Sequence, residues 1–267
     1  MAVDGISTEI TRTVVPATQR RVPSRSSSIE YVESLLITVL LALFGTTFVV
    51  QAFKIPSQSM EPTLLVGDHL LVNKFIFGGR GAWYEKFLPY RPISRGDVIV
   101  FKFPYDDHPH YVKRVIGLPG DRLRIINQRV YINGRPLDEP YVTRGAAAED
   151  IAIEDFPPSA RHFAERGFRS EWATRIFDYV DRGSLVIPPN RYFVMGDNRD
   201  QSWDSRYWGF VNRDAIMGRP LIVYWSVDAT SRDYKDRGFS GAVHGFVDSL
   251  LHLPSRTRWN RMLHQVH

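Results

Sequence analysis

The stretch DVIVFKFPYDDHPHYVKRVIGLPGDRLRIINQRVYING, residues 97–134, decides the fold class of this chain. It contains four short runs rich in Val, Ile and aromatic residues, namely DVIVFKF (97–103), YVKRVIG (111–117), RLRIIN (122–127) and RVYIN (129–133). Gly, Pro, Asn and Asp separate these runs, and Asn133-Gly134 is a turn signal. Short runs at this spacing predict the strands of an all-β sandwich or barrel.

The same pattern continues on both sides of this stretch. We expect further strands at HLLVNKFI (69–76), SLVIP (184–188), RYFVMG (191–196) and LIVYW (221–225). An Ala-rich, charged piece at 145–183 interrupts the pattern and predicts a small mixed insert, a cap or subdomain with some helix. The domain predicted from this organisation is mainly β and covers 55–228.

An uncharged apolar run, LLITVLLALFGTTFVVQAF (35–53), precedes the β-domain. As a helix it would span roughly 28 Å, close to the hydrocarbon thickness of a bilayer. It begins too far from the N-terminus, and is too long, for a cleavable signal peptide. We therefore expect a transmembrane signal-anchor helix over 29–54, with a buried helix of a soluble domain as the alternative, behind a flexible cytoplasmic tail over 1–28.

Charge indicates the orientation of this anchor and narrows the partners. Arg20, Arg21 and Arg25 precede the apolar run and Lys54 alone follows closely, which predicts a cytoplasmic N-terminus and an extracytoplasmic β-domain. The net charge of +5 is spread along the chain, which favours contact with anionic lipid, or simple solubility, over nucleic acid. The chain has no cysteine, so disulfides, thiolate nucleophiles and thiolate metal sites are excluded.

The segment after the apolar run, IPSQSMEPTL (55–64), contains two serines one residue apart. Pro56 and Pro62 restrict the backbone on either side of Ser57 and Ser59 and disfavour a helix there. A stiff segment that presents a hydroxyl suits a positioned nucleophile, although most loop serines have no such role.

A serine nucleophile needs a base, because the neutral hydroxyl is a poor nucleophile. No Gly-x-Ser-x-Gly elbow occurs, and the His108-Pro109-His110 sequence indicates a solvated turn rather than a metal-ligand pair. Lys113 has apolar neighbours, so burial could lower its pKa and make it the base. The alternative is a surface lysine with a packed stem, and periodicity does not decide, because Arg114 has equally apolar neighbours on the opposite face.

The stretch MGDNRDQSWDSRYWG (195–209) concentrates charged and polar residues beside two tryptophans. An exposed polar turn is one interpretation. The aromatic neighbours favour burial instead, and buried charges must be paired and hydrogen-bonded. The second interpretation is therefore an internal Asp–Arg network that orients a catalytic group.

In this order, behind an apolar anchor, four motifs resemble the bacterial type I signal peptidases, a family of Ser-Lys membrane-bound endopeptidases. They are IPSQSMEPTL (55–64), RGDVIVF (95–101), YVKRVIGLPGD (111–121) and GDNRDQSWDSRYWG (196–209), with weaker similarity at VYINGRPL (130–137). The resemblance covers most of residues 35–225. It implies a catalytic domain built as a coiled antiparallel β-sheet or barrel behind one N-terminal transmembrane helix.

Carried over residue by residue, the resemblance implies that Ser59 is the nucleophile and Lys113 the general base. It also implies supporting roles for Ser57 as an oxyanion donor, Ser202 as the residue that orients the lysine, and Asp204 with Arg206 as an ion pair. The shallow substrate pockets would be lined by Phe53, Ile55, Pro56, Met60, Leu64, Tyr111 and Val112.

The implied function is removal of N-terminal signal peptides from exported preproteins by acyl transfer, with cleavage after small residues in Ala-x-Ala-like sites. The implied location is the bacterial cytoplasmic (inner) membrane, in a single-pass arrangement. Implied partners are preproteins, the lipid bilayer and the secretion translocon. No nucleic acid, metal or organic cofactor is implied.

The sequence departs from the family pattern in three places. Trp203 stands where a small residue is expected between Ser202 and Asp204, which would tighten the site. The insert at 145–183 matches nothing in the family pattern. The C-terminal extension over 229–267 ends in HLPSRTRWNRMLHQVH (252–267), whose arginines and apolar residues fit a helix on the membrane surface or a solvated helix.

Two other functions remain compatible with the sequence. One is a self-processing Ser-Lys peptidase domain like those of stress-response repressors, which would carry a DNA-binding N-terminus. The other is a membrane-anchored β-domain that binds a partner without catalysis, in which Ser59 and Lys113 could be replaced without loss of function.

Overall fold

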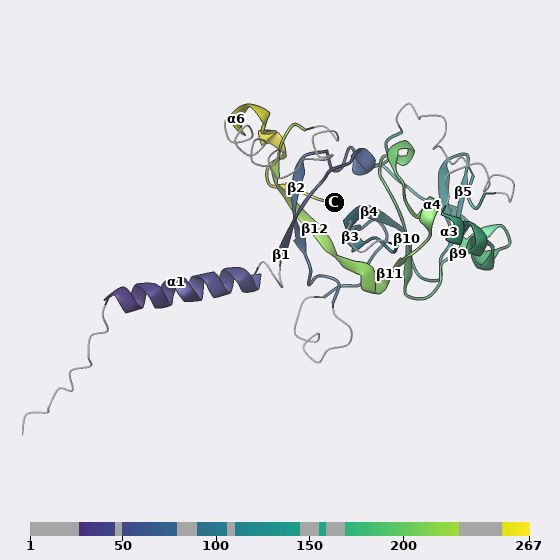
Figure 1. Cartoon of the computed structure of the whole chain (residues 1–267). Coiled ribbons are helices and arrows are strands. Elements are labelled where there is room, and N and C mark those ends of the chain that lie inside the picture. The colour runs from purple at the N-terminus through teal and green to yellow at the C-terminus, as the bar shows by residue number, and fades with distance from the viewer. Residues whose placement is uncertain are drawn as a thin grey trace, which may run out of the picture. The chain divides into compact units, whose positions relative to one another are not determined.

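The computed structural model of the protein describes residues 27–45, 50–78, 90–105, 110–144, 155–158, 169–229 and 253–267. The chain divides into two units, Met1–Leu43 and Phe44–His267. The first contains all but the last residue of the helix α1, Ser27–Phe44 (Figure 1). Large apolar side chains of α1 are 47% to 76% exposed.

The helix expected over 29–54 differs in extent from the one observed. The helix α1 ends at Phe44, and Val50–Lys54 form the strand β1 instead, paired antiparallel with β2, Asp68–Asn73. A strand can form there because Phe53 and Lys54 lie opposite Leu70 and His69, so that their backbone groups join a ladder. Within the described ranges, no helix has both the length and the apolar character needed to cross a membrane.

The second unit is built on a curled antiparallel sheet, which confirms the mainly β prediction (Figure 1). In the described residues its order is β1-β2-β12-β3-β4-β10-β11, with β13 paired to β12. The strands not yet bounded are β3 Val98–Lys102, β4 His110–Gly117, β10 Arg191–Met195, β11 Val211–Asn212, β12 Ile216–Ser226 and β13 His264–Gln265.

The long strand β12 gives this sheet its curl. Its start pairs with β3, and its later part pairs with β2 and β13. The register shifts between Ile216 and Gly218, Pro220 and Ile222, and Val223 and Trp225. Such irregularities bend a strand and increase its twist, so one strand can serve both ends of the sheet.

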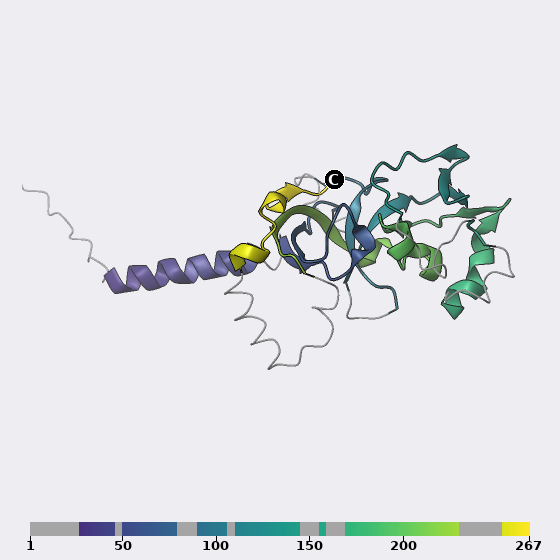
Figure 2. The ribbon, with the colours of Figure 1, turned by 90° about the horizontal axis from the view of Figure 1, so that it is seen from above.

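A smaller antiparallel sheet has the order β7-β6-β5-β9-β8. In both views it lies at the end of the domain opposite β1 and β2 (Figure 1 and Figure 2). Asn127 and Gln128, both with positive φ, connect β5 to β6, and the predicted turn at Asn133-Gly134 connects β6 to β7. The strands are β5 Arg122–Ile126, β6 Arg129–Ile132, β7 Arg135–Pro136, β8 Val180–Asp181 and β9 Ser184–Val186.

The insert predicted at 145–183 has mixed structure where it is described. It contains the helix α3, Ser170–Arg175, a 3-10 turn at Ile176–Tyr179, and β8. Phe156 and Trp172 enter the core, and Phe156 pairs with Ile125 of β5. Residues 145–154 and 159–168 lie outside the described part.

Two apolar clusters form the core. The larger one contains the side chains between the sheets, including Phe101, Val115, Phe193 and Trp208. The smaller one lies among β1, β2, β3 and β12 and contains Ile55, Met60, Leu64, Leu70, Val72, Val98, Val100, Val223 and Val266. The smaller cluster therefore buries side chains of the serine-containing segment together with one from the end of the chain.

The described part of the C-terminal extension differs from the expected membrane-surface helix. Helix α6 covers only Leu253–Arg256, a 3-10 turn covers Trp259–Arg261, and β13 follows, while residues 230–252 lie outside the described part. Arg261 does not face outward. Its guanidinium donates to Asp68 Oδ2 (2.6 Å) and to the Thr63 carbonyl (3.0 Å), and Val266 is 2% exposed.

Replacing Arg261 tests how strongly this segment is tied to the domain. The Asp68 carboxylate is fully buried, and Arg261→Ala removes its closest charged partner; the more distant Arg258 (3.9 Å), Leu65 N–H and Ser226 Oγ remain. We expect the free energy of unfolding in urea to fall by about 2 to 3 kcal/mol. The exposed neighbour Asn260 provides the control, since Asn260→Ala should leave the midpoint unchanged. Equal midpoints for both variants would contradict this role.

Candidate active site

The serine-containing segment connects β1 to β2. The N–H of Ile55 donates to the Asp68 carbonyl, and the N–H of Gly67 donates to the Ile55 carbonyl, so the ladder continues past β1. A single 3-10 turn, η2, follows at Gln58–Met60. Pro56 and Pro62 disfavour a helix, but the segment still contains this one helical turn. The turn η2 directs Ser59 and Met60 inward, and both are buried.

Ser59 and Lys113 meet in the interior. The Nζ of Lys113 donates a 2.5 Å hydrogen bond to Ser59 Oγ, and Lys113 is only 3% exposed. The strand β4, which carries Lys113, lies between β3 and β10. The surface-lysine alternative is thus wrong for Lys113. Arg114, on the opposite face of the strand, is equally buried.

Burial lowers the pKa of Lys113 from 10.5 to about 8. The charges of Asp204 and Asp197 act in the opposite direction, and the charge of Arg206 adds to the lowering. At this pKa an appreciable fraction of the side chain is neutral near pH 7, which a base in proton transfer requires.

The second serine lies close to the first. The hydroxyl oxygens of Ser57 and Ser59 are 3.4 Å apart, and Ser57 is exposed. Among the described residues, the hydroxyl of Ser59 is hydrogen-bonded to Lys113 and Ser57 rather than to a histidine. His110 instead packs edge-on against Phe53 (5.3 Å between ring centroids), and His108 lies outside the described part.

The polar stretch at 195–209 is buried except at Gln201 and Trp203, so the exposed-turn interpretation is wrong for its charged residues. Its backbone holds the serine directly, because the N–H of Asn198 donates to the Ser59 carbonyl (3.2 Å). Gly196 makes this approach feasible: a Cβ there would lie 2.3 Å from both the Ser59 carbonyl oxygen and Ser202 Oγ. Any larger residue at position 196 would push Ser59 and Ser202 apart.

Asp204 and Arg206 form the expected ion pair, with two hydrogen bonds of 2.8 and 2.9 Å between guanidinium and carboxylate. Burial alone would raise the pKa of Asp204, but the Arg206 charge and the donated hydrogen bonds lower it overall. Ser202 Oγ donates to Asp204 Oδ2 (2.7 Å) and accepts from the Gly196 N–H (3.1 Å). Its role in orienting Lys113 stays a prediction.

The sequence did not reveal two residues, Arg114 and Thr63, that connect the polar stretch to the rest of the site. Arg114 forms a bidentate pair with Asp197, at 2.8 and 2.7 Å. Thr63 donates to the same carboxylate (2.6 Å), accepts from Arg114 (3.3 Å), and its carbonyl accepts from Arg261. The signal available was the apolar surroundings of Arg114, which imply a buried partner of opposite charge.

The predicted pocket residues fall into groups. Ile55, Met60 and Leu64 are buried in the smaller core cluster, and Phe53 and Val112 pack against it half-buried. Tyr111 packs instead against the larger cluster, and Pro56 is exposed. The structure therefore brings five of the seven together and separates Tyr111 and Pro56 from them.

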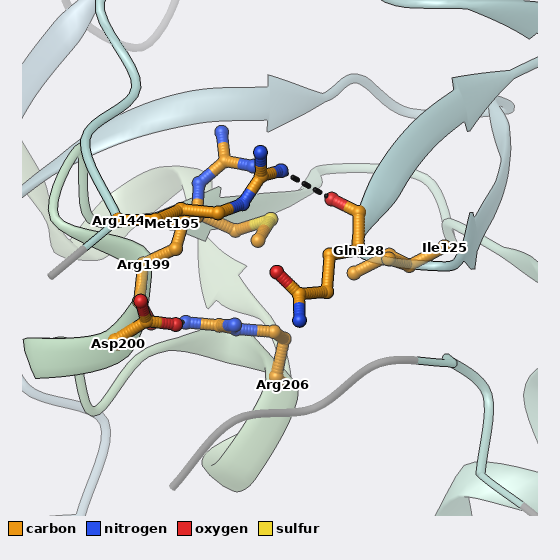
Figure 3. A pocket seen from close by; sticks show the side chains of 7 residues that line it. All are labelled: Ile125, Gln128, Arg144, Met195, Arg199, Asp200 and Arg206. Atoms are coloured by element: carbon orange, nitrogen blue, oxygen red, sulfur yellow. Dashed lines mark hydrogen bonds between the residues drawn. The ribbon is translucent and has the colours of Figure 1, made fainter. Parts of the chain in front are cut away.

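A cavity next to Arg206 is too small to take a substrate side chain. Its volume is about 10 Å³, room for a single water molecule. Figure 3 shows Arg144, Arg199 and Arg206 around it, with Arg144 donating to the Gln128 carbonyl. Arg199 forms an ion pair with Glu139 (2.5 Å). The side chains around this cavity therefore stabilise the polar stretch at 195–209.

Comparison with known proteins gives the class and then the family. The family model described as "Signal peptidase, peptidase S26" matches residues 28–225. Relatives named Signal peptidase I occur in Pseudomonas fluorescens (36% identical, covering 74% of this chain and 72% of the relative) and Pseudomonas aeruginosa (36%, 79% and 77%). The protein is thus a peptidase. It belongs to the signal peptidase I family.

A solved structure was also matched. It is a crystal structure of a signal peptidase I from Enterococcus faecalis, 31% identical, covering 48% of this chain and 97% of that chain. Its TM-score is 0.32, too low to support an argument about the fold.

Replacing Lys113 tests the burial of its charge through stability. A lysine whose folded-state pKa is lowered destabilises the fold fully below pH 8, and this penalty disappears as the pH rises to 10.5. We expect Lys113→Met to raise the free energy of unfolding at pH 7 by up to about 3 kcal/mol, at about 1.4 kcal/mol per pKa unit. The gain should shrink between pH 8 and 10.5 in denaturant titrations.

The exposed Lys102 on β3 provides the matched control. Lys102→Met removes the same charge without a buried ammonium, so its stability difference from the wild type should show no such pH dependence. A gain for Lys113→Met that stays constant from pH 7 to 10.5 would rule out a lowered pKa for this lysine.

Proposed function

We propose that the protein removes N-terminal signal peptides from exported preproteins, with Ser59 as nucleophile and Lys113 as general base. The observation that carries this proposal is the 2.5 Å contact between Lys113 Nζ and Ser59 Oγ in a buried site. Membership of the signal peptidase I family supports the substrate class. That membership also disfavours the repressor-like alternative.

The proposed mechanism is acyl transfer. Neutral Lys113 takes the proton of Ser59 Oγ as this oxygen attacks the scissile carbonyl carbon. The protonated lysine then gives its proton to the leaving amine, and an acyl-enzyme ester remains on Ser59. Water that loses its proton to the same lysine hydrolyses the ester.

The Ser57 hydroxyl and the Ser59 N–H are the proposed oxyanion donors. The position of Ser57 Oγ, 3.4 Å from Ser59 Oγ, is compatible with a hydrogen bond to an oxygen on the attacked carbon. A donor of this kind typically contributes about 3 to 4 kcal/mol to the transition state. Ser202, Asp204 and Arg206 are proposed as positioning residues for the lysine.

We propose that small residues precede the cleaved bond, as in Ala-x-Ala-like sites. This proposal is supported by the packing of the predicted pocket residues against one another. Ile55, Met60 and Leu64 are already packed in the core cluster, and half-buried Phe53 and Val112 cover it. Side chains that already pack against one another at native density favour a small substrate side chain over a long one.

We propose that α1 anchors the protein in the bacterial cytoplasmic membrane, with the N-terminus in the cytoplasm. The support is the exposure of apolar side chains on all sides of α1. Residues 35–44 of α1 carry no charge, and an exposed apolar surface of this extent favours an apolar environment. An anchored enzyme would meet its substrates by diffusion in the same bilayer, which raises their effective concentration.

The pH dependence of cleavage tests the proposed base. With a purified preprotein in detergent, kcat/KM should rise with pH through a pKa of about 8, because only the neutral lysine accepts a proton. Ser59→Ala and Lys113→Met should each lose at least about 1,000-fold in kcat. Lys102→Met is the control and should retain wild-type rates.

This experiment tests both the identity of the general base and whether the protein is catalytic at all. Near-normal cleavage by Lys113→Met would place the base elsewhere. A wild-type protein that cuts no preprotein, while binding one through its β-domain, would favour the non-catalytic alternative.

Charge introduced into α1 tests the membrane anchor. Arg at the centre of a spanning helix costs about 2.5 to 3.5 kcal/mol on insertion scales. We expect Leu36→Arg combined with Leu40→Arg to release the protein from membranes in alkaline carbonate extraction. Leu36→Ile with Leu40→Ile is the matched control and should stay in the pellet. Full retention of the arginine variant would argue against membrane anchoring through α1.

A further inference from the structure

Trp203 is an exposed tryptophan held between two buried residues. Ser202 and Asp204 on either side are 1% and 0% exposed, whereas Trp203 is 38% exposed. The Trp203 carbonyl accepts a hydrogen bond from Trp208 Nε1 (3.2 Å). The backbone of Trp203 is therefore fixed, while part of its indole remains open to solvent.

The indole of Trp203 belongs to a row of aromatic rings. Its centroid lies 5.4 Å from that of Phe103, and the Phe103 centroid lies 4.8 Å from that of Tyr111. Phe103 itself is buried, so the row rests on the core. We name Trp203, Phe103 and Tyr111 the aromatic ledge.

The aromatic ledge begins beside the reacting groups. Lys113 Nζ lies 5.8 Å from the centroid of the Tyr111 ring. At the other end, Ser202 Oγ and the Ser59 carbonyl oxygen each lie 2.3 Å from the position that a Cβ on Gly196 would take. Trp203 is thus the covalent neighbour of a residue that lies close to the nucleophile.

The aromatic ledge is separate from the small-residue pocket. Tyr111 and Val112 are successive residues of β4 and point to opposite faces. Val112 packs against the smaller core cluster, with Ile55 and Met60, whereas Tyr111 packs against the larger one. An extended substrate also presents alternate side chains to opposite sides, so one of its side chains could meet each surface.

We propose that Trp203 is a specificity-determining residue, which binds one apolar or aromatic side chain of the substrate next to the scissile bond. This inference rests on the proposed peptidase function. A fixed, partly exposed indole loses little side-chain freedom on binding, and aromatic pairs contribute beyond their buried area. Preference for Phe over Ser at the matching substrate position should be about tenfold in kcat/KM.

The test uses full-length protein in detergent and a set of peptides with one cleavage site. Each peptide carries either Phe or Ser at one position, from three residues before the cleaved bond to two residues after it. The enzymes are the wild type, Trp203→Ala, Trp203→Phe and the control Trp259→Ala, which removes an exposed tryptophan of the C-terminal segment.

The wild type and Trp259→Ala should prefer Phe about tenfold at one position. Trp203→Ala should lose that preference while it cuts the Ser peptides at rates within about threefold of the wild type. Trp203→Phe should keep most of the preference, because a ring remains. The pH dependence of kcat/KM should be unchanged in all four, because each of them keeps Tyr111, the ring of the aromatic ledge beside Lys113, and the bond from Lys113 to Ser59.

Three results would overturn the proposal. A uniform loss on every peptide would mean that Trp203 acts only by packing on Ser202 and Asp204. An unchanged preference in Trp203→Ala would exclude contact with substrate. Weaker binding to phosphatidylglycerol vesicles, with peptide preference intact, would assign the indole to the membrane surface. If the wild type cuts no peptide at all, the proposed peptidase function itself fails, and that outcome is distinct from the other three.

Discussion

The burial of the Lys113 ammonium beside Ser59 is the constraint on which the rest of the structure depends. Desolvation is the largest effect that lowers the pKa of this lysine; the charge of Arg206 adds to it, and the nearby carboxylates of Asp204 and Asp197 oppose it. The strand β4 must therefore be interior to the sheet, and η2 must cover it. Both conditions are met, since β3 and β10 flank β4 and Ser59 is buried.

Burial of charged groups destabilises the fold unless the charges are paired, and the polar stretch at 195–209 supplies such pairs. It brings charges into the interior, and four of its residues are paired: Asp197 with Arg114, Arg199 with Glu139, and Asp204 with Arg206. Buried pairs of this kind add little net stability, because desolvation offsets their attraction. They do fix positions, and here Asn198 N–H and the Cβ-free Gly196 hold the backbone of Ser59 in place.

The curl of the sheet brings these parts together. The strand β12 pairs with β3 near one end and with β2 and β13 towards the other, so residues from the start, middle and end of the chain share one cluster. Val266 packs with Met60, and Arg261 reaches the Thr63 carbonyl. Thr63 in turn donates to Asp197, so two successive hydrogen bonds connect the C-terminal segment, through the serine-containing segment, to the polar stretch at 195–209.

The sequence by itself determined eight strands (β2, β3, β4, β5, β6, β9, β10 and β12) and the turn at Asn133-Gly134, because alternation of apolar residues and turn chemistry are local properties. With the family resemblance it also pointed to Ser59 and Lys113. Only the tertiary structure decided that both Lys113 and Arg114 are buried, since each faces a different partner that lies far away in sequence. The end of α1 at Phe44 could not be predicted from the sequence, because the pairing of β1 with β2 forms only on folding. The inward direction of Arg261 could not be predicted either, because its contact with Asp68 also forms only on folding.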